Sequence, residues 1–209
     1  MIGILVGMRS EARLLPGRLV LCSGGRPERA RALAQRMLDE GAEGLLSFGI
    51  AGGLDPRLTP GNLVIGSAVA AGGRRLEADA AWCRRLAAAL PGACSGIIAG
   101  SDEVVASAAA KAELAARCGA VAVDMESGAV AEACARAGKP FAVLRAIADP
   151  AGRGIPALAM RGLGPDGETR PLAVAAGLLR HPGDLPALIR LGRDSQAALA
   201  ALAAVGSVL

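Results

Sequence analysis

The stretch AVAVDMESGAVAEACARAGKPFAVLRAIADP, residues 120–150, carries the clearest fold signal in this chain. Its two apolar runs, 120–124 and 141–149, are typical of buried strands, and residues 126–137 between them have the pattern of an amphipathic helix. Each apolar run ends on a carboxylate. Such carboxylates serve either as helix caps or as parts of a pocket that holds hydroxyl groups and moves a proton.

The alternation of apolar strands and helices extends over about the first 150 residues. It predicts an α/β fold in which a largely parallel sheet is covered by helices on both faces. A chain of 209 residues fits a single domain, 1–209, with a sizeable core. The further strands that we expect are residues 2–7, 18–22, 44–49, 62–70 and 95–100, and the further helices are residues 27–41, 78–90 and 107–117.

The character of the sequence changes after Pro150. A segment rich in glycine and proline, 151–170, predicts a loop, and we expect two or three short helices after it, with Asp184 and Asp194 as N-caps. The apolar tail, 197–209, is expected to dock on the sheet or on another subunit of a homo-oligomer. Peripheral contact with the inner membrane is the alternative, although the tail lacks the dense basic face of an interfacial helix.

The composition argues against several classes of function. Two Phe, one Trp and no Tyr leave few rings to stack on bases, and the arginines are spread along the chain, so we expect no nucleic-acid partner. Five cysteines without C-x-x-C spacing argue against disulfides and zinc and favour a cytoplasmic protein. The single histidine, His181, lies in a turn-like segment, so we expect neither a histidine base nor a metal site.

Ligands of α/β sheets bind beyond the carboxyl ends of the strands, so the loops there form the candidate site. Glu11 follows the first strand. A glycine turn at Gly25 precedes a helix N-terminus whose N–H groups could hold an anion, together with Arg26 and Arg29. Gly49 begins a glycine-rich segment that permits close approach of the backbone to a ligand. Each of these features also has an ordinary explanation as a helix start or a turn.

The acidic residues of the 120–150 segment differ in how well capping explains them. Asp124 precedes a helix, where a cap accepts otherwise unpaired N–H groups. Glu126 is followed by small residues that leave room for a ligand. Asp149 precedes Pro150 and lies on a loop rather than at a cap. We therefore expect Glu126 and Asp149 to face a ligand.

These segments stand in the order of a known family. The segments at 2–15, 23–30, 49–67 and 123–149 resemble the nucleoside phosphorylase and nucleosidase superfamily, which cleaves N-glycosidic bonds of purine nucleosides. The resemblance implies a three-layer α/β sandwich with a central mixed, mostly parallel sheet flanked by helices. The VDMESGAVA motif and the C-terminal segment look most like the hopanoid-associated phosphorylases, which implies release of adenine from adenosylhopane.

The resemblance also implies roles for the candidate residues. Asp149 is similar to the acid that serves N7 of the leaving adenine, and Glu126 to the carboxylate that accepts hydrogen bonds from the ribose hydroxyls. Glu11 matches the position of the carboxylate that activates water in the hydrolytic members. The other implied substrate contacts are Met125, Asp124, Ser101, Asp102 and Phe48.

Inorganic phosphate is the co-substrate that the resemblance implies, with no cofactor. It would be held by Gly25, Arg26, Arg29 and Gly49. Ser47 and Ile50 depart from the family pattern, because many phosphorylases have Arg and Thr or Ser there. We expect phosphorolysis, with hydrolysis of methylthioadenosine or S-adenosylhomocysteine as the alternative. A non-catalytic nucleoside-binding module and a membrane-associated scaffold are the rival classes.

Overall fold

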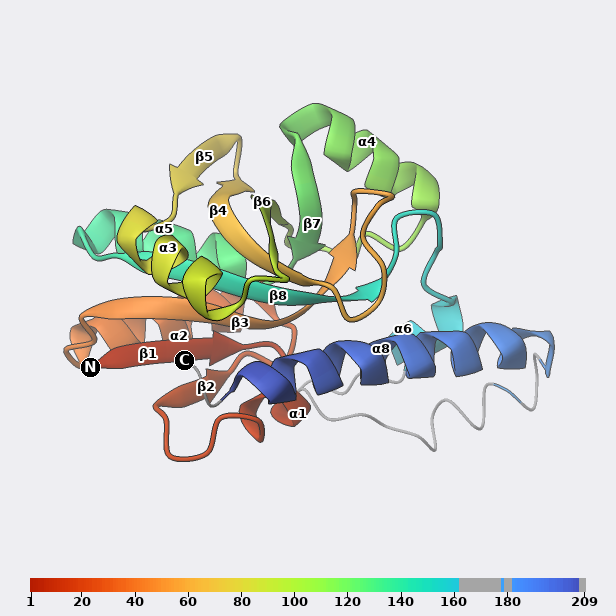
Figure 1. The fold of residues 1–209 in the computed structure, drawn as a ribbon, viewed down its shortest axis with the longest axis horizontal. Helices are drawn as coiled ribbons and strands as arrows, with labels where there is room; N and C mark the ends of the chain where they lie inside the picture. Colours follow the sequence, from red (N-terminus) through yellow and green to blue (C-terminus); the bar gives the residue numbers. More distant parts are fainter. Residues whose placement is uncertain (162–177, 179–181, 207–209) are drawn as a thin grey trace.

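The computed structural model describes residues 1–161, 178 and 182–206. The strands in this part of the chain form one mixed sheet of eight strands, which confirms the predicted fold class (Figure 1). They are β1 (Ile2–Val6), β2 (Val20–Cys22), β3 (Gly44–Gly53), β4 (Leu63–Ala71), β5 (Arg74–Glu77), β6 (Cys94–Gly100), β7 (Ala120–Asp124) and β8 (Phe141–Asp149).

The sheet closes on itself around five of these strands. β3 pairs with β8, β8 with β4, β4 with β6, β6 with β7, and β7 returns to β3. The return pairing is antiparallel and joins the last residues of both strands, because Gly52 lies opposite Val123. Asp149, the last residue of β8, also lies opposite Gly52. The carboxyl ends of β3, β7 and β8 therefore meet.

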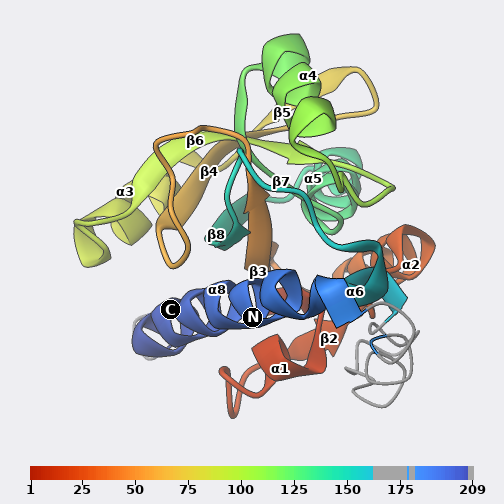
Figure 2. The same cartoon turned by 90° about the vertical axis from the view of Figure 1, so that its right-hand side faces the viewer.

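Helices cover both faces of the sheet (Figures 1 and 2). α2 and α5 pack against each other over one face, where Met37 and Val130 are fully buried. α8 and α3 cover the other face with Leu202 and Leu86. The helices of the described ranges are α1 (Arg9–Ala12), α2 (Pro27–Asp39), α3 (Ala80–Ala89), α4 (Ala108–Cys118), α5 (Ser127–Ala137), α6 (Ala157–Arg161), the 3-10 turn η1 (Pro182–Asp184) and α8 (Leu185–Val205).

The alternation of side chains along β8 places its polar residues. Ala142 and Leu144 point into the core under α8, whereas Val143 and Ile147 point into the core under α2 and α5. Successive side chains of a strand point to opposite faces, so Arg145 shares the direction of the second pair. β8 thus carries a buried arginine toward the side where the acidic strand ends meet.

The C-terminal segment differs from the prediction. One helix of 21 residues, α8, replaces the expected short helices, because a single interior glycine, Gly192, weakens a helix by only about 1 kcal/mol. Asp184 is the N-cap residue, but Asp194 lies inside α8, and its Oδ2 is 2.8 Å from Nη1 of Arg153. The predicted loop, 151–170, is wrong in part, because residues Ala157–Arg161 form the short helix α6, and residues 162–170 lie outside the described part of the chain.

The apolar tail packs onto the sheet as far as the structure describes it. Ala198 and Leu202 are fully buried, and Val205 is buried as well. Contacts of α8 with β8 and β3 confirm docking on the sheet as the role of this helix. Residues 207–209 of the predicted tail lie outside the described ranges. Within those ranges, no helix combines the length and the apolar character that crossing a bilayer requires.

Candidate active site

A cavity of about 160 Å³ lies where the carboxyl ends of β1, β3, β7 and β8 converge. This is the position at which α/β sheets bind ligands. Its lining combines a carboxylate group, Glu11, Glu103, Asp124, Glu126 and Asp149, with an apolar group, Met8, Ile50, Val104, Val105, Val123, Met125 and Ile155.

Glu11 is held in one orientation by backbone donors. The N–H groups of Gly7 and Met8 both donate to its Oε2 at 2.8 Å, and the N–H group of Ile50 donates to Oε1 at 2.8 Å. The side chain is almost completely buried. Burial raises the pKa of Glu11 above its usual range, although Arg145 and the three N–H donors oppose that shift. Glu11 is therefore a fixed carboxylate suited to accepting a proton.

Glu126 lies at the junction of β7 and α5, beside the glycine turn. Ser23 Oγ donates to Glu126 Oε1 at 2.9 Å, and Ser23 Oγ accepts from the N–H group of Gly25 at 3.2 Å. Burial raises the pKa of Glu126 to about 7, against the lowering effect of Arg145. The neighbouring carboxylates of Asp124 and Glu11 contribute to this rise. Glu126 therefore exchanges its proton near neutral pH.

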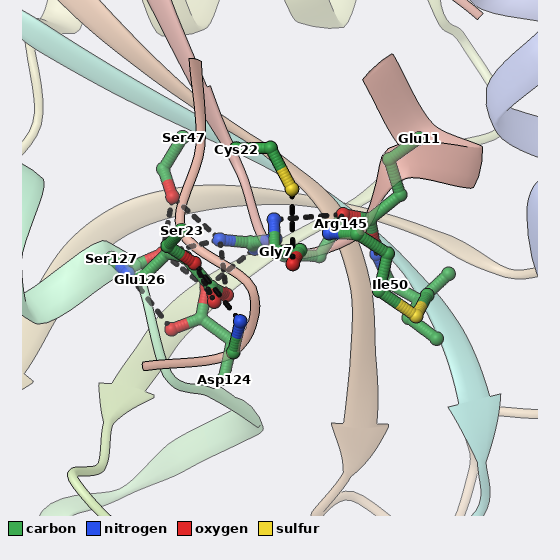
Figure 3. Close-up of polar contacts among 12 residues, drawn as sticks. Gly7, Glu11, Cys22, Ser23, Ser47, Ile50, Asp124, Glu126, Ser127 and Arg145 are labelled. Carbon is green, nitrogen blue, oxygen red and sulfur yellow. Dashed lines mark hydrogen bonds and ion pairs between the residues drawn. The ribbon is translucent and has the colours of Figure 1, made fainter. Parts of the chain in front are cut away.

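Arg145 is the positive charge shared by the carboxylates of Glu11, Asp124 and Glu126 (Figure 3). The side chain is fully buried, and its Nη2 donates to Ser47 Oγ at 2.5 Å and lies 3.7 Å from Glu126 Oε2. Its Nε forms an ion pair with Asp124 Oδ2 without the alignment of a hydrogen bond. The charge of Arg145 is thus shared among several acidic groups.

Nη1 of Arg145 is buried and makes no hydrogen bond with a described residue. A Cβ added at Gly49 would lie 2.6 Å from this Nη1 and 2.5 Å from Glu11 Oε1, so a side chain there would clash with both atoms. Gly49 has a φ of +152°, which few other residues adopt. Glycine at position 49 therefore lets the arginine and the glutamate approach each other.

Asp149 is held by a lysine rather than an arginine. Its carboxylate forms an ion pair with Lys111 of α4, and both side chains are buried. Burial raises the pKa of Asp149, and the hydrogen bond from Lys111 lowers it. The oxygen Oδ2 would lie 3.2 Å from a Cβ at Gly52, so the absence of a side chain there leaves space for this carboxylate.

Asp124 performs both functions considered from the sequence. Its Oδ1 accepts from the N–H group of Ser127 at 3.0 Å, at the start of α5, and its Oδ2 accepts from the hydroxyl of Ser127. The residue also lines the cavity and pairs with Arg145. Capping is therefore a correct interpretation of Asp124, whereas Glu126 makes no capping hydrogen bond.

The structure brings together six of the residues that the sequence identified. The cavity lining contains Glu11, Gly25, Asp124, Met125, Glu126 and Asp149. Gly49 lies behind the lining, against Glu11 and Arg145. These residues come from five separate segments of the chain, so the fold gathers them as the family resemblance implies.

Other predicted residues lie elsewhere. Phe48 is fully buried in the core on the α8 side, because its neighbours Ser47 and Gly49 point toward the site and side chains alternate along β3. The side chains of Arg26 and Arg29 are exposed on the first turns of α2, outside the cavity lining. Phe48, Arg26 and Arg29 are thus not among the residues that line the cavity with Glu126 and Asp149, although their predicted roles place them at a substrate or phosphate.

Ser101 and Asp102 line a different cavity, of about 270 Å³, on the outer side of β6 and α5. Asp102 is exposed and accepts two hydrogen bonds from Arg31 at 2.6 and 2.7 Å. Ser101 Oγ donates to the carbonyl oxygen of Glu103 at 2.6 Å. The predicted contact of these residues with the base is thus not supported by their placement.

The sequence interpretation missed Arg145 and Lys111. A charged residue inside the apolar run 141–149 was a signal for Arg145, since its position has the same parity as Asp149. Lys111 stands in an alanine-rich helix, where a lysine normally faces solvent, so its burial had no signal in the sequence. Among the described residues, no group of three or more His, Cys, Asp or Glu side chains is placed to hold a metal ion.

The fold and the cavity define an α/β protein whose acidic site lies at the carboxyl ends of its strands, where sheets of this class bind small ligands. A family model described as Phosphorylase superfamily matches residues 13–162. This match covers well over half of the chain, and the chain belongs to the phosphorylase superfamily, which includes nucleoside phosphorylases and nucleosidases.

Solved structures share this fold at low sequence identity. The 5′-methylthioadenosine/S-adenosylhomocysteine nucleosidase of Neisseria meningitidis superposes with a TM-score of 0.72 at 20% identity, over 99% of this chain and 97% of that one. The S-adenosylhomocysteine nucleosidase of Streptococcus pyogenes gives 0.66 at 23% identity, over 72% and 84%. The futalosine hydrolase of Helicobacter pylori gives 0.65 at 22%, over 71% and 87%. A comparison with curated protein sequences gives no match.

Proposed function

We propose that the protein hydrolyses the N-glycosidic bond of a 5′-substituted adenosine and releases adenine. The observation that carries this proposal is the charge of the cavity: five carboxylate residues line it, and its described lining contains no lysine or arginine. Phosphate is an anion at neutral pH and would be repelled by these carboxylates. Water carries no charge and needs only a base.

Glu11 is that base. Its side chain lines the cavity, and its carboxylate is fixed by three N–H groups. A water molecule in the cavity that donates a hydrogen bond to the Glu11 carboxylate would be oriented and made more nucleophilic. The raised pKa of Glu11 favours its taking a proton during the attack.

Glu126 holds the sugar. A carboxylate accepts hydrogen bonds from both hydroxyls of a vicinal diol, and Glu126 is a buried carboxylate of the lining with Met125 beside it. Arg145 lies behind Glu126 and favours its ionised form, which is the form that accepts both bonds. The apolar side chain of Met125 then covers the sugar ring.

Asp149 serves the leaving purine. As the bond to C1′ breaks, electron density moves into the base, and N7 becomes a stronger hydrogen-bond acceptor. A proton delivered to N7 by way of the Asp149 carboxylate lowers the cost of departure, typically by ~10²–10⁴-fold in rate. In the overall reaction, Glu11 takes one proton from water, adenine gains one, and the sugar keeps the hydroxyl group.

The chemistry of the named relatives supports this choice. The relatives from Neisseria meningitidis and Streptococcus pyogenes are nucleosidases of methylthioadenosine or S-adenosylhomocysteine, and the Helicobacter pylori relative is a hydrolase. Phosphorolysis of adenosylhopane is the second candidate. The apolar lining residues Val104, Val105 and Ile155, of which Val104 is exposed, would suit a hydrocarbon substituent on the substrate.

The experiment is a phosphate titration of adenine release from methylthioadenosine, S-adenosylhomocysteine and adenosylhopane. We expect the full rate without phosphate, and a loss of about 10²-fold or more in Glu11→Gln. Glu113→Gln, an exposed acid on α4, is the matched control and should behave as wild type. A rate that rises from near zero in proportion to phosphate, with Glu11→Gln unimpaired, would refute hydrolysis and favour the second candidate.

A further inference from the structure

We propose that Lys111 is a positioning residue of the reaction, which holds the Asp149 carboxylate in place and supplies the proton that Asp149 passes to the leaving purine. This inference rests on the proposed function, because it concerns how Asp149 acts on the base. It goes beyond that function, because it assigns a lysine from α4, outside the cavity lining, to the leaving-group step.

Lys111 is one of the most completely buried charged side chains in the described structure. Its Nζ donates to the carboxylate of Asp149, to the carbonyl oxygen of Pro150 at 3.0 Å and to that of Arg153 at 3.0 Å. The carbonyl oxygen of Asp149 lies a further 3.4 Å away. The lysine thus reaches from α4 to the loop that follows β8.

These contacts require the charged form of the lysine. An ammonium group has three protons, and three oxygens, on Asp149, Pro150 and Arg153, stand ready to accept them. A neutral amine would offer two protons and would direct its lone pair at an oxygen. Lys111 therefore rests as an ammonium ion beside the Asp149 carboxylate, and each is the other's counter-charge.

Of the charged groups around Asp149, Lys111 has the largest influence on the ionisation of its carboxylate. The charged groups that act on it are Lys111 of α4, Arg153 of the following loop and Asp194 of α8. Arg153 and Asp194 pair with each other at 2.8 Å, so they largely offset one another. Lys111 is then the group that most opposes the effect of burial on the pKa of Asp149, and it orients the carboxylate.

The proton transfer balances without a further reactant. When the glycosidic bond breaks, a proton of Lys111 Nζ moves to the Asp149 carboxylate and from that carboxylate to the N7 lone pair, so an Nζ–H bond breaks and an N7–H bond forms. The result is N7-protonated adenine, an ionised Asp149 and a neutral Lys111. A proton from solvent returns Lys111 to the ammonium form after adenine leaves.

The test compares two leaving groups in Lys111→Met and in the matched control Lys139→Met, which changes an exposed lysine after α5. One substrate is methylthioadenosine, whose base needs a proton. The other is 4-nitrophenyl β-D-ribofuranoside, whose phenolate leaves without one. We expect Lys111→Met to lose ~10²-fold or more on the first and less than about 3-fold on the second. Lys139→Met should match wild type on both.

Equal losses on both substrates would overturn the proposal, because they would show a merely structural role, and so would no loss on either. Lys111→Arg supplies a second variant that keeps the charge and should recover part of the lost adenosine activity. If Lys111→Met fails to fold, the same comparison in Lys111→Arg decides: a loss confined to methylthioadenosine supports the role, and an equal loss contradicts it.

A measurement without turnover separates this inference from the proposed function. Carbon-13 NMR titration of aspartate carboxyls is assigned with Asp149→Asn. The pKa of Asp149 should be higher in Lys111→Met than in wild type and higher in Lys111→Met than in Lys111→Arg. An unchanged Asp149 titration would overturn the inference even in an active enzyme. A wild type that releases no adenine from any nucleoside tested would refute the proposed function instead.

Discussion

Asp149 and Glu126 are both buried carboxylates of one cavity, yet their counter-charges differ. Asp149 has a lysine of its own, Lys111, in a pair of one charge against one. Glu126 shares a single arginine, Arg145, with Asp124 and Glu11. In the balanced pair, Lys111 opposes the rise that burial causes in the pKa of Asp149, whereas three carboxylates around one cation retain excess negative charge and take up protons.

This difference in counter-charges suits the two sides of the site to different steps of the proposed reaction. The side of Asp149 has to deliver a proton to a base, and a lysine ion pair is a source of protons. The side of Glu126 and Glu11 has to hold a diol and accept a proton from water, and carboxylates with raised pKa values accept protons readily. Substitutions on the two sides should therefore have distinguishable effects.

The largest effect is expected from Asp149→Asn. Asparagine keeps the shape of the side chain but cannot pass on a proton, so adenine release should fall by ~10²–10⁴-fold. Binding of a substrate analogue, measured by calorimetry, should change far less. Adenine release that stays within about 3-fold of the wild-type rate would show that Asp149 does not have its assigned role.

A second large effect is expected from Gly49→Ala. The new methyl group would meet Arg145 Nη1 and Glu11 Oε1, and the positive φ adds backbone strain. We expect a loss of about 1–3 kcal/mol in the free energy of unfolding, measured by urea denaturation, together with loss of activity. Gly73→Ala, at a turn whose Cβ would meet no neighbour but whose φ is also positive, is the control for backbone strain alone. Equal destabilisation by both changes would contradict the close approach of Arg145 and Glu11.

A smaller effect, visible as a pH dependence, is expected from Glu126→Gln. The folded pKa of about 7 lies above the ordinary value of 4.5, so the folded state binds the proton more tightly than the unfolded state. The contribution of Glu126 to the free energy of unfolding is therefore complete below about pH 4.5 and is lost as the pH rises to about 7. The variant should therefore lose less stability than wild type between pH 5 and 7.5, in thermal or urea unfolding. Parallel pH profiles for the two proteins would contradict the raised pKa.

The smallest effect is expected from Asp102→Asn. Its ion pair with Arg31 is exposed and lies outside the site cavity, so we expect a change of less than about 1 kcal/mol in stability. Adenine release should be unchanged. A loss of more than 10-fold in activity would place Asp102 at the substrate after all, as the family resemblance implies.

The sequence predicted the elements that local patterns determine. Residues 120–124 and 141–149 form strands with the expected bounds, and the helix at Pro27 begins where its proline indicates. The same patterns placed Glu11, Glu126 and Asp149 at strand ends, and the fold brings them to one cavity. Periodicity and family order were sufficient for these features.

Long-range packing decided the rest. Phe48 lies in the core because neighbouring positions of a strand face opposite sides, and Ser47 and Gly49 of β3 face the site. Lys111 is buried because the loop after β8 closes over α4, and no local pattern in an alanine-rich helix encodes that contact. The short edge strand β5 pairs with β4 across a turn at Gly72 and Gly73 and was also missed.

Isotope tracing tests the central claim most directly. The protein is incubated with methylthioadenosine in phosphate-free buffer made with ¹⁸O-labelled water, and the sugar product is analysed by mass spectrometry under conditions that limit anomeric exchange. Hydrolysis assisted by Glu11 predicts one heavy oxygen on C1 of methylthioribose for each adenine released. Release of adenine only after phosphate is added, with a sugar 1-phosphate as product, would contradict the account.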